Sequence, residues 1–484
     1  MIVKGVQVDG RDDSTKSPYK IIEELRAIIA EQAKTIARLE NEISILKERL
    51  TERERQLGLN SRNSSKPPSS DGFKKPSRVQ SLREKSGKKA GGQLGHTGST
   101  LKQIENPDSI KQHKVTQCPC CNSDLSNVPV DSLIKRQIFD VPEIKPIVTE
   151  HQFEVKYCPG CNKKVESPKE QFINAPVQYG NNAKSIITYL NVQNLVPVDR
   201  VAATMRDIFG LGVSTATVEN VTKLCSDIVA QPVAKIESIL KSAAVKGSDE
   251  SGLIINEKIN WVHTLSNDKF VYYRLSEKRG DISTGLSGTV THDHFVSYYS
   301  KLEGVQHSLC NAHHLRELKA LIEIDKELWA RSMFRLLLLG CTKRKQDPTN
   351  ITDDWLTRFR RLYDKIISTG LAFHEMLEPL SKPKRGKIKR RPGHNLLLRL
   401  KNCADDTLRF LYDPNVPFTN NSAEQSLRMV KVKQKVSGCF RTFDGAKHFL
   451  NIRSYTATAQ KNDFNVFDAL TKTFCGNPFD FAPS

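Results

Sequence analysis

The stretch PFTNNSAEQSLRMVKVKQKVSGCFRTFDGAKHF, from Pro417 to Phe449, places one carboxylate, Glu424, in the first turn of a basic helical segment. Two other acids stand at the ends of short apolar runs upstream: Asp249 in AAVKGSDESG and Asp293 in SGTVTHDHF. Carboxylates gathered from distant positions are what a protein needs to hold Mg²⁺ against phosphate oxygens. We therefore expect a fold that brings these three acids into one magnesium site.

Two of the three acids also have a purely structural interpretation. Glu424 lies three residues after Asn421 and could be the third member of a helix capping box. Asp249, which precedes Glu-Ser-Gly, could belong to a turn. Taken singly, the two residues leave these structural alternatives open.

Composition points to a polyanionic partner. The 484 residues predict several domains, and 74 Lys and Arg against 54 Asp and Glu give a formal net charge of +20. Such an excess favours a nucleic-acid partner, with a merely basic enzyme as the alternative. The chain shows no apolar run of membrane-spanning length, no signal peptide and no disulfide pattern among its eleven cysteines. We expect a cytoplasmic, nucleoid-associated protein with no membrane partner.

The N-terminal region predicts self-association. We expect a disordered tail over residues 1–18 and a coiled coil over residues 19–59, because apolar residues recur every 3.5 positions. The pattern favours a parallel homodimer or higher oligomer, and the alternative is an amphipathic helix packed on its own domain. One heptad position holds Ile22, Ile29, Ile36, Ile43, Leu50 and Leu57. The other holds Leu25, Gln32, Leu39, Leu46 and Arg53.

Residues 60–112 are rich in Ser, Pro, Gly and basic residues, which predicts a flexible basic linker. Residues 113–170 then carry two C-x-x-C pairs, each of which can present two thiolates to a tetrahedral Zn²⁺. The β-branched run between the pairs predicts a hairpin, so we expect a zinc ribbon with one structural zinc. Unliganded buried cysteines are the alternative. The ligands would be Cys118, Cys121, Cys158 and Cys161.

Residues 171–235 predict three helices, of which the last two have helix-turn-helix spacing around the Gly210 turn and the N-cap candidate Ser214. The second helix of such a motif lies in the major groove of DNA, although many helical hairpins bind no DNA. The candidate contacts are Thr215, Thr217, Asn220 and Lys223.

The rest of the chain predicts an interrupted catalytic domain. Alternating strands over residues 240–316, the first carrying an acid, indicate an RNase H-like fold. An α-helical insertion follows over 317–414, the second catalytic part over 415–462, and a C-terminal tail over 463–484. The predicted fold class is thus multidomain α+β, with a coiled coil, zinc ribbon, helix-turn-helix and RNase H-like catalytic domain.

Two sets of basic residues are candidate phosphate contacts, and a solvated basic surface is the alternative for each. The first follows Glu424 along its helix and consists of Arg428, Lys431, Lys433 and Lys435. The second lies in the insertion and consists of Lys384, Arg385, Lys387, Lys389, Arg390 and Arg391.

The chain resembles the DDE transposases of the insertion-sequence-66 family nearly end to end. The resemblance rests on NSSKPPSSDG at Asn63, GGQLGHTG at Gly91 and the paired cysteine knuckles. It rests further on the motifs Cys310-Asn-Ala-His313, Leu315-Arg316, Asn420-Asn421-Ser-Ala-Glu424 and Ser437-Gly-Cys-Phe-Arg441. It implies that Asp249, Asp293 and Glu424 are the acidic triad.

The resemblance also implies a chemistry. Two Mg²⁺ ions, which Mn²⁺ could replace, would be bridged by Asp249 and flanked by the other two acids. The enzyme would cleave the ends of double-stranded element DNA and join them to a target, with small accessory proteins as further partners. Cys310 and His313 would brace the active site without binding metal, and Asn420 and Asn421 would support it.

The sequence departs from the family pattern around the second acid. His292-Asp293-His294-Phe295 stands where the family usually has Asp-Gly-Tyr or Asp-Gly-Phe, and Asp281 is the alternative second acid. Glu250-Ser251 after the first acid replaces the usual Glu-Thr. A catalytically inactive DNA-binding regulator and a host nuclease of the same fold therefore remain the alternative functions.

Overall fold

The computed structural model describes residues 18–64, 66, 101–168, 173, 175–347, 349, 351–380 and 388–481. The chain divides into two units, one of residues 1–76, 175–201 and 214–484 and the other of residues 77–174 and 202–213. Both helices and strands are present, as expected for an α+β chain. No helix among the described residues is long and apolar enough to cross a membrane. Residues 1–17 of the tail predicted for residues 1–18 lie outside the described residues.

A mixed sheet forms the centre of the first unit, with its described strands in the order β5-β4-β3-β6-β7. Strands β3, β4 and β5 pair antiparallel, whereas β6 pairs parallel with both β3 and β7. Asn256 and Glu257 close the β3–β4 turn with positive φ angles of 44° and 64°, as a two-residue hairpin requires. All five strands fall within residues 240–316, the region for which the sequence predicted alternating strands. Their bounds are β3 Val245–Ile255, β4 Lys258–Ser266, β5 Val271–Ser276, β6 Thr289–His292 and β7 Gln306–Leu309.

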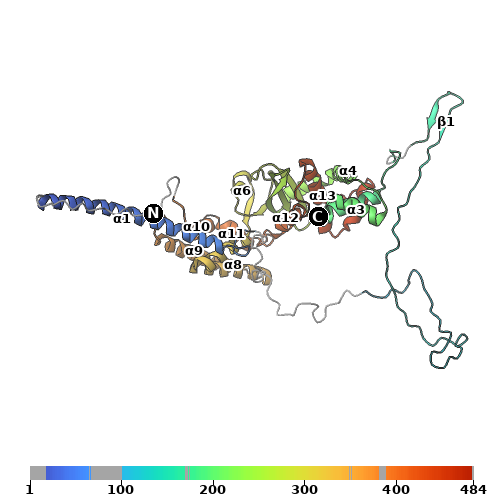
Figure 1. Ribbon diagram of the computed structural model, residues 1–484, viewed down its shortest axis with the longest axis horizontal. Helices are drawn as coiled ribbons and strands as arrows, with labels where there is room; N and C mark the ends of the chain where they lie inside the picture. Colours follow the sequence, from blue (N-terminus) through green and yellow to red (C-terminus); the bar gives the residue numbers. More distant parts are fainter. Residues whose placement is uncertain are drawn as a thin grey trace, which may run out of the picture. The chain divides into compact units, whose positions relative to one another are not determined.

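Two C-terminal helices pack against this sheet (Figure 1), α12 (Asn421–Ser437) on β3 and α13 (Phe443–Lys461) on β5. The α13 helix also protects the sheet edge. Val271 donates its backbone N–H to Thr458 Oγ1 (3.1 Å), and Tyr273 donates to Ser454 Oγ (3.0 Å). These hydroxyls satisfy edge groups that would otherwise be free to pair with another strand.

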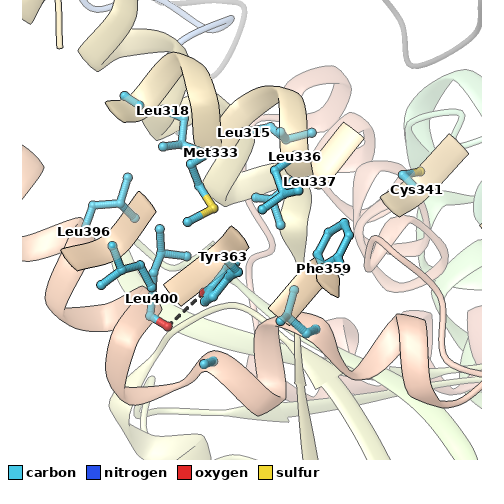
Figure 2. Close-up of a cluster of buried hydrophobic side chains, with 14 of the residues drawn as sticks. Leu315, Leu318, Met333, Leu336, Leu337, Cys341, Phe359, Tyr363, Leu396 and Leu400 are labelled. Atoms are coloured by element: carbon cyan, nitrogen blue, oxygen red, sulfur yellow. Dashed lines mark hydrogen bonds between the residues drawn. The ribbon is translucent and has the colours of Figure 1, made fainter. Parts of the chain in front are cut away.

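An all-α block separates β7 from α12 in the sequence, as predicted. Its helices α8, α9, α10 and α11 pack side by side (Figure 1) around a buried apolar cluster. In Figure 2, Tyr363 points into this cluster and donates its hydroxyl to the carbonyl of Leu400 at 2.8 Å. The helices that lead into and form the block are α6 (Val296–Lys301), α7 (Asn311–Ala320), π-helix η3 (Leu321–Asp325), α8 (Leu328–Gln346), α9 (Asp353–Glu375), α10 (Pro392–Asn402) and α11 (Ala404–Tyr412).

A long N-terminal helix, α1 (Pro18–Gly58), meets this block at its C-terminal end. Arg55 forms an ion pair with Asp325 (3.2 Å), and Asn63 donates to Glu323 (3.3 Å). Asn63 is only 2% exposed, so residues 60–64 are ordered where the sequence predicted the start of a linker. The predicted heptad residues remain exposed, for example Ile36 at 55% and Leu39 at 46%.

Four more helices of the chain precede the sheet: α2 (Asn181–Thr188) with π-helix η2 (Tyr189–Gln193), α3 (Val198–Phe209), α4 (Thr215–Ile228) and α5 (Ala230–Ser242). Ser214 caps α4 by accepting the N–H of Thr217 at 3.0 Å, which confirms the predicted N-cap. After α13 the chain forms α14 (Val466–Phe474), whose Leu470 and Phe474 are buried. The segment predicted as a C-terminal tail over residues 463–484 thus contains a helix with buried residues.

The second unit contains the two cysteine knuckles and a two-stranded sheet, β1 (Val155–Tyr157) paired with β2 (Lys164–Glu166). This hairpin encloses the second knuckle. The sequence predicted a hairpin in the run between the two knuckles, and this prediction was wrong. Of that run, only the last three residues, Val155–Tyr157, are in a strand. Ile138 and Ile147 are each 94% exposed there, so the strand-like pattern has no apolar surface to pack against.

Candidate active site

The two aspartates stand at matching positions on neighbouring strands. Gly247 of β3 pairs with Thr291 of β6; Asp249 follows two residues later within β3, and Asp293 directly follows His292, the last residue of β6. The negative charge of Asp293 acts on Asp249, so the two carboxylates lie near each other at this end of the paired strands. Glu424 comes from the first turns of α12, the helix packed on β3. Parallel pairing and helix packing thus gather the three predicted acids.

The gathered carboxylates repel one another. Burial raises the pKa of Asp249 well above its ordinary value, and the negative charges of Glu250, Glu424 and Asp293 raise it further. The backbone N–H of Glu250, which donates to Asp249 at 2.9 Å, opposes this rise only in part. A buried carboxylate facing three others is a place where a divalent cation would relieve both burial and repulsion.

Glu424 does not act as a helix cap. The N-cap of α12 is Asn420, without a side-chain cap bond, and the backbone of Glu424 donates to the Asn420 carbonyl at 3.1 Å. Its carboxylate instead faces α7, where Arg316 Nη2 lies 3.7 Å from Oε2 and His313 Nδ1 lies 4.0 Å from Oε1. The Cys310 thiol donates to Oε1 at 3.5 Å.

The cysteine-histidine pair therefore lies directly beside the third acid. Burial, followed by the charge of Glu424, raises the pKa of Cys310 to about 12. Burial, followed by the positive charge of Arg316, lowers the pKa of His313. The ligand atoms of Cys310, His313 and Glu424 all lie within 4.8 Å of one another.

Asn420 ties the third acid to the first. Its Nδ2 donates to the carbonyl of Ser248 at 2.7 Å, and its backbone N–H donates to Cys310 Sγ at 3.1 Å. Asn420 is 4% exposed, while Asn421 is exposed as the first residue of α12. The supporting role is thus carried by contacts of Asn420, and the structure gives Asn421 no comparable contact among the described residues.

Sequence reasoning missed Glu250, whose side chain is 1% exposed. One of its carboxylate oxygens accepts from Arg279 (2.8 Å) and the other from the Tyr298 hydroxyl (2.7 Å). Arg279 also lies over the ring of Phe295, two residues after Asp293, at 4.2 Å. Burial, followed by the Asp293 charge, raises the pKa of Glu250. Its position directly after Asp249 was the signal that could have identified it.

The histidine that precedes the second acid, an unusual residue for the family, is packed inside the protein. His292 is fully buried at the end of β6, hydrogen-bonded to His307 (2.9 Å) and stacked on Tyr298. Burial lowers the pKa of His292 to about 3, so it is a neutral structural residue. The alternative second acid, Asp281, is exposed and pairs with Arg274 at 3.4 Å.

The basic residues of α12 do not all face solvent. Arg428, Lys431 and Lys435 follow Glu424 at helical spacing; the first and last are exposed, and Lys431 donates to the carbonyl of Gly252. Lys433 is 6% exposed and donates to Asn191 Oδ1 at 3.0 Å, as well as to the main-chain oxygens of Asn191 and Val196. The prediction that Lys433 contacts DNA is therefore corrected: its ammonium is already bound inside the protein.

The other candidate DNA contacts are partly described. Lys384, Arg385 and Lys387 lie outside the described residues. Lys389 and Arg390 are exposed, whereas Arg391 donates to the carbonyl of Glu378 at 2.8 Å. On α4, the exposed candidates are Thr215, Asn220 and Lys223. Thr217 is half-buried and bonded to the Ser214 hydroxyl (2.9 Å).

The two cysteine knuckles repeat one local structure. In each, the backbone N–H of the asparagine after the second cysteine donates to the carbonyl of the first, from Asn122 to Cys118 (2.9 Å) and from Asn162 to Cys158 (2.8 Å). Both asparagines take a positive φ, 57° and 54°.

The thiols within each knuckle interact with one another, Cys118 with Cys121 and Cys158 with Cys161. Hydrogen bonds from Ser123 lower the pKa of Cys121, and backbone N–H groups lower that of Cys158. These features suit two pairs of thiolate ligands for zinc.

Comparison with known families matches three parts of the chain. Residues 176–448, more than half of the chain, match a family model described as "Transposase IS66 family". Residues 116–162 match the zinc-finger binding domain of transposase IS66, which indicates a structural zinc in this segment. Residues 13–102 match a family of unknown function, DUF6444. No curated protein matches the chain.

Proposed function

Because the chain belongs to the IS66 family of transposases, we propose that it is a DDE enzyme that cleaves the ends of its element and joins them to target DNA. One observation carries the proposal: Asp249, Asp293 and Glu424 converge from a central strand, a neighbouring strand end and a packed helix. The strand order β5-β4-β3-β6-β7, with three antiparallel strands and two parallel ones, is that of an RNase H-like fold and supports this assignment.

The donor set fits Mg²⁺. Its members are carboxylates, the ligands that this ion prefers, and the mutual repulsion of Asp249, Glu250, Asp293 and Glu424 is what a dication neutralises. Asp249, Asp293 and Glu424 would hold the metal. Bound there, Mg²⁺ would stabilise charge on the scissile phosphate and lower the pKa of the attacking water or 3′-hydroxyl.

The neighbouring residues position these acids. Asn420 fixes the start of α12 against Ser248, so the Glu424 carboxylate is held at a set distance from Asp249. Arg279 and Tyr298 hold Glu250, and Arg279 also contacts Phe295 beside Asp293. Positioning of this kind matters because small displacements of catalytic groups cost large factors in rate.

The DNA-binding surfaces follow from exposed basic residues. Arg428 and Lys435 continue from Glu424 along one face of α12, where they would contact phosphates near the cleavage point. The exposed Lys389 and Arg390 and the residues Thr215, Asn220 and Lys223 of α4 would bind DNA further away. The α4 assignment supposes that α3 and α4 form the predicted helix-turn-helix.

The N-terminal parts would organise the complex. The four cysteines of the knuckles would hold one structural Zn²⁺, a role that the zinc-finger match supports. The exposed apolar seam of α1 would pair two chains as a coiled coil, which brings two active sites to the two ends of an element.

A labelled DNA fragment that carries the element's end tests this function. The full-length protein should cut it and join it to a target duplex only when Mg²⁺ or Mn²⁺ is present, with accessory proteins supplied. Cutting without joining would indicate a nuclease instead. Specific binding without cutting would indicate a DNA-binding regulator.

A further inference from the structure

A second cluster of metal-binding atoms lies beside the proposed magnesium site. Cys310 is the N-cap residue of α7, His313 is in the first turn of that helix, and Glu424 faces both from α12. The atoms Cys310 Sγ, His313 Nδ1 and a Glu424 oxygen all lie within 4.8 Å of one another. They belong to three different ligand types, sulfur, imidazole nitrogen and carboxylate oxygen.

One of these atoms has nothing else to bind. The Nδ1 of His313 is buried and makes no hydrogen bond within the described part of the chain, and Glu424 Oε1 lies 4.0 Å from it. A buried polar nitrogen without a partner costs about 1–3 kcal/mol, and a bound ion would remove that cost. The orphaned atom therefore points to a ligand that the protein alone does not provide.

The spacing suits a tetrahedral ion. Zinc lies about 2.3 Å from sulfur and about 2.0–2.2 Å from nitrogen or oxygen, so tetrahedral ligands stand about 3.4–3.6 Å apart. Cys310 Sγ lies 3.5 Å from Glu424 Oε1, and His313 Nδ1 lies 4.0 Å from it. A movement of the His313 ring towards Cys310 and Glu424 would bring all three atoms, which already lie within 4.8 Å of one another, around one ion.

One backbone contact favours a thiolate at Cys310, although burial and the charge of Glu424 raise the pKa of its thiol in the protein without metal. The backbone N–H of Asn420 donates to Cys310 Sγ at 3.1 Å, which stabilises negative charge on the sulfur. Arg316 lies 3.7 Å from Oε2 of Glu424, the carboxylate oxygen that the cluster does not use, and its positive charge helps to keep His313 neutral, as a metal ligand must be. His313 and Glu424 are 28% and 17% exposed, so an ion can reach the buried sulfur from solvent.

We infer that Cys310, His313 and Glu424 form a second metal site, which binds a thiophilic divalent ion such as Zn²⁺ and shares Glu424 with the magnesium site. Sulfur and imidazole ligands select zinc and similar ions over Mg²⁺, which takes oxygen ligands. Water or a substrate atom would complete the coordination, since three protein ligands leave one position open.

Because both proposed sites use Glu424, an ion in one site would affect the other. An ion held by Glu424 Oε1 removes that oxygen from the magnesium site, so thiophilic ions would inhibit cleavage. This consequence rests on the proposed function, whereas binding of the ion does not. The pair Cys310 and His313 would then act as a metal-responsive element rather than as the inert brace that the sequence predicted.

Metal content of the full-length protein tests the site in the absence of DNA. After equilibration with Zn²⁺ and removal of free ion, Cys310→Ala and His313→Gln should each retain about one zinc per chain less than the wild type. Cys341→Ala is the matched control, because Cys341 is also a buried free thiol but lies in the helical block. It should retain the wild-type content.

Cadmium-113 NMR of the full-length protein provides the second readout. A resonance typical of mixed sulfur, nitrogen and oxygen ligands should appear beside that of the four-thiolate knuckles, vanish in Cys310→Ala and persist in Cys341→Ala. Wild-type metal content in both Cys310→Ala and His313→Gln, or no mixed-ligand resonance, would overturn the inference. Either result leaves the proposed cleavage activity standing, because no DNA enters these measurements.

Discussion

The side chain of Asn420 donates a hydrogen bond of 2.7 Å to the main-chain oxygen of Ser248, a residue 172 positions earlier in the chain. Ser248 directly precedes Asp249, and Asn420 directly precedes the helix that carries Glu424. This bond therefore joins the two segments of the proposed active site across the entire helical block. Its partners are buried, so breaking it leaves unsatisfied polar groups at a cost of about 1–3 kcal/mol.

Gly247 makes this contact possible. A Cβ at position 247 would lie 2.1 Å from Asn420 Oδ1, and moving the amide away would break its bond to Ser248. We expect Gly247→Ala to lower stability by about 1–3 kcal/mol and to reduce cleavage further by displacing Glu424. The control is Gly252→Ala on the same strand, where the nearest atom would lie 3.7 Å from the new Cβ. Equal urea midpoints and equal rates for the two variants would show that the contact is unimportant.

The repulsion around Asp249 predicts a trade-off between stability and activity. The folded state raises the pKa of this carboxyl above its unfolded value of roughly 3.9, so the folded protein holds a proton that the unfolded chain has released. At a pH below the unfolded pKa this group does not lower the free energy of unfolding. As the pH rises from the unfolded pKa to the raised folded pKa, the folded protein loses stability. At neutral pH without Mg²⁺, Asp249→Asn should therefore be more stable than the wild type by about 1 kcal/mol, yet inactive.

Thermal unfolding in EDTA across pH checks this expectation. Asp281→Asn is the control, since its carboxylate is exposed beside Arg274, and it should shift stability by less than about 0.5 kcal/mol. The wild type should gain stability from added Mg²⁺, and Asp249→Asn should gain much less. A destabilised Asp249→Asn in EDTA would mean that this carboxylate is not repelled by its neighbours.

Substitutions of one arginine and one lysine on α12 should have different effects, one on DNA binding and the other on the stability of the fold. Arg428 is exposed, so Arg428→Ala should weaken DNA binding and reduce the slope of log affinity against log salt by about 1. Lys433 is buried on Asn191 and Val196, so Lys433→Ala should lower stability by about 1–3 kcal/mol and leave the salt slope unchanged. Fluorescence anisotropy at several salt concentrations distinguishes the two. A changed slope in a folded Lys433→Ala would contradict the internal assignment.

The exposed seam of α1 should hold the oligomer together. Ile36 lies in the middle of the predicted heptads and is 55% exposed in the chain, so Ile36→Glu should dissociate the protein. Lys34→Glu changes charge on the same helix away from the seam and should leave the oligomer intact. Light scattering after size-exclusion chromatography measures both masses. A monomeric wild type, or an intact Ile36→Glu oligomer, would rule out the coiled coil.

Local patterns in the sequence predicted much of this structure. Alternation gave the strands around Asp249 and Asp293, and the Ser214 cap placed the start of α4, because both depend on residues close together in the chain. The predicted hairpin between the knuckles failed. A β-branched alternating run forms strands only where it finds a surface to cover, and Ile138 and Ile147 find none.

The contacts that the sequence did not reveal are long-range. In the sequence, Lys433 looks like one more surface cation of its helix. Only its hydrogen bonds to Asn191 of η2 show that its charge is bound inside the protein. Glu250 likewise depends on Arg279 and Tyr298, which come from other segments of the sheet domain. The helix α14 was missed because its apolar pattern is too short to indicate a helix by itself. Its buried face is recognised only from its packing against α2.

The choice of the second acid tests the central claim most directly. Cleavage and joining of a labelled element end in Mg²⁺ should be measured for Asp293→Ala, Asp281→Ala and Glu424→Ala beside the wild type. The proposed site predicts that Asp293→Ala and Glu424→Ala lose both reactions while still binding the DNA, and that Asp281→Ala keeps them. An active Asp293→Ala, or an inactive but folded Asp281→Ala, would contradict it.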